Sequence, residues 1–259
     1  MNGSSALQSS ESVTRRNPPS AQAATNPFID VAGLAKSYGG EVALADISFA
    51  IERGEILGII GPNGAGKTTL LEVLAGIIPG DAGIVCCCGR PVPGESRRES
   101  MFYLPDGIRP YRDQYVAHVL AFFAGVYGVP RDGTARVIAA TGLQSVLDRR
   151  VRTLSKGFGR RLLLALGLLV PHPLLLMDEP FDGFDLRQTR DVVRLLRSEA
   201  AKPRSLVLAI HQLTDAERVC DRFVLLSQGR IRGHGTLDEL RERTGLARAG
   251  LEEIFLALT

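Results

Sequence analysis

The nine residues at positions 61–69 read GPNGAGKTT, and they decide how this 259-residue chain folds. The apolar run EILGIIG at 55–61 leads into them, and LLEVLAG at 70–76 follows with leucines at helical spacing. The first run predicts a buried strand and the second a helix. A strand, a loop G-x-x-x-x-G-K-[ST] and a helix in this order are typical of a phosphate-binding loop.

The glycines, the lysine and the two threonines of this loop have predicted roles. Its glycines let backbone N–H groups converge on phosphate oxygens at the positive end of the helix. Lys67 is expected to neutralise the β and γ phosphates, Thr68 to place its hydroxyl on Mg²⁺, and Thr69 to bond a phosphate. The predicted nucleotide contacts are Gly61, Pro62, Asn63, Gly64, Ala65, Gly66, Lys67, Thr68 and Thr69.

A second apolar run, LLLMDEP at 174–180, ends in acidic residues. We expect Asp178, at the end of this strand, to hold Mg²⁺ through water, which a nucleoside triphosphate site requires. Glu179 follows it and is placed to polarise an attacking water as a general base. Together the two motifs predict a site that binds a nucleoside triphosphate with Mg²⁺ and cleaves it.

The order of the segments predicts an α/β fold, a P-loop NTPase (RecA-like) core with a mainly parallel sheet. Runs such as LLLMD and SLVLAI are apolar throughout and alternate with helices, which is typical of a parallel sheet covered on both sides. Short strands between 28 and 51, expected to be antiparallel, precede this core. The region of about 107–167 is mostly helical in pattern and predicts an inserted helical subdomain.

The first 26 residues are rich in Ser, Asn, Ala and Pro and predict a disordered tail at 1–26. The predicted domain then spans 27–259, with a C-terminal extension at about 235–259. The tail lacks the apolar block of a secretory signal. The longest apolar stretch, 162–177, is broken by PHP, whereas a membrane span needs about 20 apolar residues in a row. We therefore expect the chain to act at a bilayer only through a partner.

The amino-acid composition narrows the possible classes of protein further. With 45% hydrophobic residues the chain can bury a core, so disorder throughout is excluded. The 31 basic and 28 acidic residues leave a net charge of +3, which is too balanced to predict a nucleic-acid binder. Three of the four cysteines are consecutive, Cys86 to Cys88, and no CxxC spacing occurs. They are predicted to be small hydrophobic residues of a strand, in a reducing cytosol.

Between the two motifs lies LSKGFGRR at 154–161, directly before the helix that leads to LLLMDEP. Taken with KSYGG, YLPDG, FDGFD and LAIHQL, it resembles the nucleotide-binding subunits of ATP-binding cassette (ABC) transporters. The resemblance runs from about Phe28 to the C-terminus, and the order and spacing of the motifs agree throughout.

The resemblance implies further site residues. Tyr38 resembles the aromatic residue that stacks on adenine. Ser155 and Gly157 resemble signature residues that contact the γ phosphate bound by the opposite subunit, and Asp185 matches the aspartate that communicates between the two sites. His211 matches the switch histidine that contacts the γ phosphate.

Three departures from the family pattern stand out. Asp106 in YLPDG occupies the position of a glutamine that senses Mg²⁺ and the γ phosphate, and it remains a candidate Mg²⁺ ligand. The signature carries Lys156 and Phe158 where glycine and glutamine are commoner, and AIH replaces the usual hydroxyl-bearing pair. None of these changes removes the loop lysine or the Asp-Glu pair, so we expect an active ATP hydrolase.

The resemblance also implies partners. A signature that completes the site of another subunit requires a homodimer or heterodimer with a second ABC ATPase domain, and the motion is delivered to a separate membrane permease at the cytoplasmic face. Tyr111 and Tyr115 could equally contact the permease at the surface or lie in the core of the helical lobe. Phe122 and Phe123 are expected in that core. The ending LEEIFLALT resembles exporter ATPases, which favours export over import.

Two other functions stay open at this point. One is an ATP-driven clamp that works on DNA or ribosomes without transport. Lys67 and Asp178 are too close in sequence for the long insertions of such clamps, which favours the transporter. The other is a regulatory cassette without turnover, against which Glu179 argues. The sequence leaves open the cargo, the choice of homodimer or heterodimer, and the effect of Asp106 on the rate.

Overall fold

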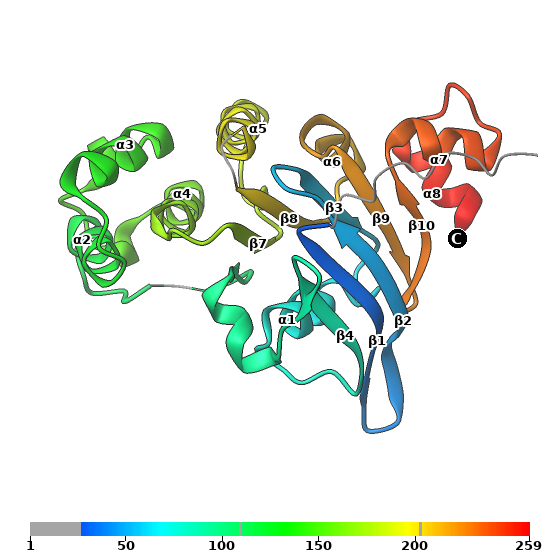
Figure 1. The fold of residues 1–259 in the computed structure, drawn as a ribbon. Coiled ribbons are helices and arrows are strands. Elements are labelled where there is room, and N and C mark those ends of the chain that lie inside the picture. Colours follow the sequence, from blue (N-terminus) through cyan, green and yellow to red (C-terminus); the bar gives the residue numbers. More distant parts are fainter. Residues whose placement is uncertain (1–26, 109, 202–203) are drawn as a thin grey trace, which may run out of the picture.

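The computed structural model describes residues 27–108, 110–201 and 204–259 (Figure 1). The tail predicted at 1–26 lies outside the described residues. The strands are β1 (Ile29–Tyr38), β2 (Glu41–Ile51), β3 (Ile56–Ile60), β4 (Ala82–Cys87), β5 (Arg90–Pro91), β6 (Met101–Leu104), β7 (Leu174–Asp178), β8 (Ser205–Ile210), β9 (Arg222–Ser227) and β10 (Arg230–Gly235). The α-helices are α1 (Lys67–Ala75), α2 (Val116–Val126), α3 (Arg131–Thr141), α4 (Lys156–Leu169), α5 (Leu186–Ala200), α6 (Leu213–Val219), α7 (Leu237–Thr244) and α8 (Leu251–Leu258).

The larger sheet has six strands in the order β10-β9-β3-β8-β7-β6. Only β10 runs antiparallel to its neighbour; the other pairs are parallel. Every residue of β3, β7 and β8 is buried, as expected for apolar strands in the middle of a covered sheet. Register pairs Ile60 with Ile210 and Asp178 with Ala209, so β3, β7 and β8 end at the same edge.

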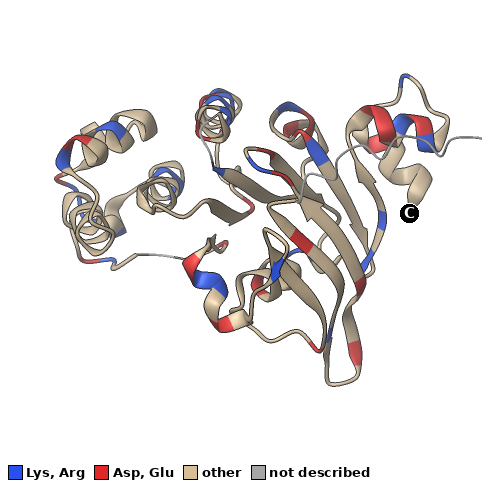
Figure 2. Cartoon of the chain, viewed as in Figure 1, with Lys and Arg blue, Asp and Glu red and all other residues tan. Residues whose placement is uncertain are grey.

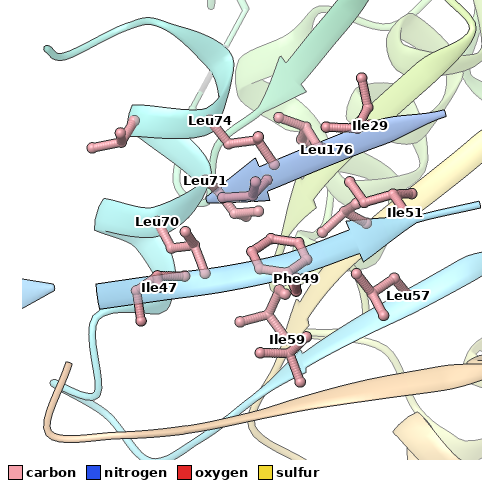
Figure 3. Packing of buried hydrophobic residues seen from close by; sticks show 14 of the residues in the cluster. Ile29, Ile47, Phe49, Ile51, Leu57, Ile59, Leu70, Leu71, Leu74 and Leu176 are labelled. Carbon is pink, nitrogen blue, oxygen red and sulfur yellow. The ribbon is translucent and has the colours of Figure 1, made fainter. Parts of the chain in front are cut away.

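Alternation along each strand divides the core between the two faces of this sheet. Leu57 and Ile59 of β3 pack with Leu70, Leu71 and Leu74 of α1 and with the antiparallel sheet (Figure 3). Ile56 and Ile60 pack on the opposite face, with helices α5 and α6. The apolar runs therefore form a layered α/β core, which confirms the predicted fold class.

The smaller sheet is antiparallel, in the order β2-β1-β4-β5. β1 and β2 form a hairpin through Gly39 and Gly40, and β4 pairs with the other edge of β1. Cys86 and Cys87 lie in β4 with partly buried side chains, while the following Cys88 is exposed. The antiparallel N-terminal strands expected from the sequence are present.

Helices α2, α3 and α4 lie together at one end of the sheet (Figure 1). Their shared cluster includes Val116, Leu120 and Leu162. Leu164 and Leu168, on another side of α4, pack instead against the sheet and join the lobe to it. The lobe predicted at about 107–167 is thus a helical region fastened to the core through α4.

Phe122 is 62% exposed, so its expected place in the lobe core is wrong. The buried residues of α2 are Val116, Val119, Leu120 and Ala124. Phe123 follows Leu120 by three residues and Val119 by four, so it lies on the same helix face and is partly buried. Phe122 lies two residues from both Leu120 and Ala124, off the middle of that face, and is exposed.

The C-terminal extension packs on the sheet domain through Leu240 of α7 and Leu251 and Ile254 of α8. Charged residues gather on the helices and turns, while the strands of the larger sheet carry few (Figure 2). Among the described residues, no helix has the length and apolarity needed to cross a bilayer.

Candidate functional site

The loop between β3 and α1 wraps around the start of α1. Gly66 caps this helix with φ 103°, and a Cβ there would lie 2.7 Å from the carbonyl oxygen of Ala43. Gly61 is confined for a different reason, because a Cβ would lie 2.3 Å from the carbonyl oxygen of Leu226. These close approaches need glycine and leave backbone N–H groups at the positive end of α1 for an anion.

Lys67 is buried, with 6% of its side chain exposed. Its Nζ donates to the carbonyl oxygens of Gly61 at 2.9 Å and Pro62 at 3.3 Å. The same atom lies 3.5 Å from Oε1 of Glu179. The ammonium group of Lys67 is therefore bound by two loop carbonyl oxygens and the Glu179 carboxylate, which a triphosphate can replace.

Thr68 and Asp178 meet across the site, where the threonine hydroxyl donates to Oδ2 of Asp178 at 2.6 Å. The other carboxylate oxygen, Oδ1, is buried and has no hydrogen-bond partner among the described residues. Burial raises the pKa of Asp178, while the Thr68 hydrogen bond opposes that shift. A buried carboxylate oxygen without a partner, beside a hydroxyl, fits a hydrated Mg²⁺ ion.

In the described part of the chain, no group of three or more His, Cys, Asp and Glu side chains could hold a metal ion alone.

Glu179 follows the end of β7 in the left-handed backbone region, with φ 48°. Its N–H donates to the carbonyl oxygen of Ala209 on β8 at 3.0 Å, which ties the unusual backbone to the neighbouring strand. Oε2 of Glu179 lies 2.6 Å from Nδ1 of His211. Because an ionised carboxylate only accepts, Nδ1 is the donor in this bond.

Lys67, Thr68, Asp178 and Glu179 border a cavity of about 480 Å³. It is bounded by the phosphate loop, by β1 and β2, and by the ends of β6 and β7. The sequence-predicted residues along it are Tyr38, Asn63, Gly64, Gly66, Lys67, Thr68, Thr69, Asp106, Asp178 and Glu179. Glu41, Val42 and Ala43 of β2 also border it, and no motif pointed to them.

Seven predicted residues do not border this cavity. Gly61, Pro62 and Ala65 belong to the phosphate loop itself, and His211 contacts Glu179. The other three come from more distant parts of the chain. Ser155 caps α4, where its Oγ accepts from the N–H of Phe158, and it borders a separate cavity on the lobe side. Gly157 approaches the side chain of Gln188. Asp185 caps α5 by accepting from the N–H of that same glutamine. Within one chain, none of the three lies at the phosphate loop.

Asp106 borders the nucleotide cavity but pairs with Arg160 of α4. The sequence assigned no site role to Arg160 or to its second partner, Asp182. Arg160 lies in LSKGFGRR and Asp182 in FDGFD, and their pairing depends on how α4 packs beside β6 and β7.

This fold and site define a phosphate-loop nucleoside triphosphatase domain with a helical lobe. A family model described as "ABC transporter" matches residues 44–182, more than half of the chain. The chain therefore belongs to the ABC transporter family, as an ATP-binding subunit. ATP hydrolysis is the general activity of these domains.

Similar proteins agree with this assignment. The chain is 34% identical over 232 residues to "Nod factor export ATP-binding protein I" of Ralstonia nicotianae, covering 86% of this chain and 71% of that protein. It is 36% identical over 220 residues to the protein of the same name from Rhizobium sp. strain N33, covering 83% and 72%. A solved structure, "Structure of ATP binding subunit of ABC transporter", superposes with a TM-score of 0.81 at 30% identity, covering 89% of this chain and 99% of that one.

Proposed function

We propose that this chain binds ATP with Mg²⁺, closes against a second ABC ATPase domain, and hydrolyses ATP to drive a separate membrane permease. The observation that carries the proposal is the single cavity into which the phosphate loop, the Thr68–Asp178 pair and Glu179 converge. A charged lysine, a magnesium-binding pair and a general base are the parts that phosphoryl transfer to water needs.

Donor groups of the site bind the phosphates, and its oxygen ligands bind the cation. Backbone N–H groups of the loop and Lys67 bind the β and γ phosphates, and the exposed ring of Tyr38 offers a surface on which adenine stacks. Thr68 and Asp178 hold the cation, with Asp106 as a further oxygen donor. When bound, Mg²⁺ neutralises the charge that develops on the phosphate oxygens.

Glu179 accepts a proton from the attacking water. Without nucleotide, its two oxygens face Lys67 and His211. A bound γ phosphate attracts both of these cation-forming side chains, so nucleotide binding frees one carboxylate oxygen for water. His211 keeps the carboxylate oriented and contacts the γ phosphate.

A second ATPase domain completes the site. Ser155, Gly157 and Asp185 lie away from the chain's own phosphate loop, which supports their action on nucleotide bound by a partner. In a Glu179→Gln chain with cysteines 86–88 replaced by serine, Asn63→Cys and Ser155→Cys should form an intermolecular disulfide only with ATP and Mg²⁺.

Arg194→Cys, on the exposed face of α5, replaces Ser155→Cys in the control and should give no disulfide. Equal crosslinking of the two pairs, or none with nucleotide present, contradicts the proposed dimer.

The permease docks on an apolar groove of about 850 Å³ between the loop after β6 and helix α2. Tyr111 is 78% exposed there, Phe122 62% and Ile108 48%, so the rim presents apolar surface that no other described residue covers. Tyr115 does not border this groove; the Arg150 guanidinium lies over its ring. The protein thereby sits at the cytoplasmic face of the membrane.

The export direction is proposed from relatives that carry "export" in their names. Affinity purification from solubilised membranes should recover a multi-span protein, and Tyr111→Ala with Phe122→Ala should reduce that recovery. Leu256→Ala, an equally exposed apolar residue on α8, is the control and should not. Recovery of ribosomes or DNA instead would favour a clamp that works without transport.

A further inference from the structure

Four charged side chains form a connected cluster that joins three parts of the fold. Arg160, on α4, pairs with Asp106 in the loop after β6 and lies 3.3 Å from Oδ2 of Asp182 in the loop after β7. Lys156, one turn earlier on α4, lies 2.9 Å from the same Asp182 oxygen. We name Lys156, Arg160, Asp106 and Asp182 the ionic cluster.

Asp106 is the member of the ionic cluster that borders both the nucleotide cavity and the lobe-side cavity. It borders the nucleotide cavity together with Lys67 and Asp178, and it also borders the lobe-side cavity together with Arg160. The Arg160 side chain is only 12% exposed, whereas that of Asp106 is 48% exposed. The arginine is therefore fixed in position, and the aspartate is the partner with room to change its contacts.

We propose that Arg160 is a positioning residue that competes with the Mg²⁺-bound nucleotide for Asp106. This inference rests on the proposed function, because it takes Asp106 as an oxygen donor to the cation. Without nucleotide, Arg160 holds the carboxylate and ties α4 to the loop after β6. An ion pair with a half-exposed partner is weak enough for a divalent cation to displace it.

Arg160 retains Asp182 when it releases Asp106. The arginine then keeps one carboxylate partner, so its largely buried charge is not left unpaired. When Arg160 releases Asp106, α4 loses its contact with the loop after β6, and Asp106 gains a contact with the bound cation. In this way nucleotide binding loosens the lobe from the loop after β6 while the link to the loop after β7 remains.

The test is Arg160→Met, which keeps an unbranched side chain like the aliphatic part of arginine and removes the guanidinium charge. Calorimetry measures binding of ATP with Mg²⁺ and of ATP with a chelator. A freed Asp106 attracts the cation and repels the bare triphosphate. We expect Mg²⁺–ATP to bind about two- to five-fold more tightly and Mg²⁺-free ATP to bind more weakly by a similar factor.

The matched control is Arg161→Met, on the same helix and with the same loss of charge. Arg161 donates to the carbonyl oxygen of Thr141 inside the lobe and does not contact Asp106. We expect no opposite change in the two affinities for this variant. In an Asp106→Asn chain, Arg160→Met should also lose the opposite changes.

Two results overturn the inference: parallel weakening of both affinities in Arg160→Met, as simple structural damage produces, or opposite changes that persist in the Asp106→Asn chain. Failure of the unaltered chain to bind Mg²⁺–ATP contradicts the proposed function itself. Normal binding by the unaltered chain without the opposite changes in Arg160→Met removes only this inference.

Discussion

Nδ1 of His211 donates a hydrogen bond of 2.6 Å to Oε2 of Glu179, although 32 positions separate the two residues. They meet because β7 and β8 are parallel neighbours that end at the same edge of the sheet. The other oxygen of Glu179 lies 3.5 Å from Nζ of Lys67. The expected general base is thus held between two groups that a γ phosphate attracts.

Glu179→Gln should lower the turnover of ATP by roughly 10²- to 10⁴-fold, because an amide cannot accept the proton of the attacking water. ATP affinity should stay close to that of the unaltered chain. Phosphate release and calorimetry measure the two effects. Glu252→Gln, exposed on α8, makes the same chemical change away from the site and should leave turnover intact. Undiminished hydrolysis in Glu179→Gln would remove the assigned role.

Lys67→Ala should weaken the binding of ATP itself, because the charge of the γ phosphate loses its buried partner. The expected loss is at least about tenfold, the lower end for a charge-assisted contact of roughly 1.5–3 kcal/mol. Calorimetry with ATP and Mg²⁺ measures it. Arg194→Ala, an exposed cation on α5, is the control and should bind normally. Normal ATP affinity in Lys67→Ala would contradict the predicted phosphate contact.

His211→Ala should reduce turnover by up to about 10²-fold, which is what misplacing a reacting group costs. The carboxylate of Glu179 loses the bond that orients it, while the phosphate loop stays unchanged. His211→Gln keeps a donor at this position and should recover part of the rate. Equal rates in both variants and the unaltered chain, measured at saturating ATP, would exclude an orienting role.

Asp178→Asn should reduce the dependence of ATP binding on Mg²⁺ and raise the thermal unfolding midpoint of the nucleotide-free protein at neutral pH. Burial raises the pKa of Asp178 in the folded state, so its ionised form disfavours folding. That penalty grows as pH rises from the unfolded toward the folded pKa, and it is absent below the unfolded pKa. The stability gain of Asp178→Asn should therefore shrink toward acid pH, and scanning calorimetry at two pH values measures it.

Leu176→Ala should lower the free energy of unfolding by about 2–5 kcal/mol, because it leaves a cavity between the larger sheet and α1. Leu176 is fully buried in β7. Leu256→Ala is the same substitution at a residue that is 71% exposed, and it should cost within about 0.5 kcal/mol. Denaturant unfolding compares them, and similar losses for both would be inconsistent with the described core.

Much of the fold was predictable because it depends on contiguous residues. Apolar runs identified β3, β7 and β8, and helical spacing identified α1. Phe122 shows where the prediction failed although a signal existed. The buried positions 116, 119, 120 and 124 of α2 share one face, and position 122 lies off it.

The sequence by itself determined the chemistry that short segments carry: the phosphate loop, the acidic strand end and the membership of the ABC family. These depend on local backbone conformation and on residue types within a few positions of each other. Only the tertiary structure decided which distant side chains meet. Thr68 bonds Asp178 across 110 positions, and Arg160 reaches Asp106 across 54. Such pairs follow from strand order and helix packing, which no local stretch of sequence specifies.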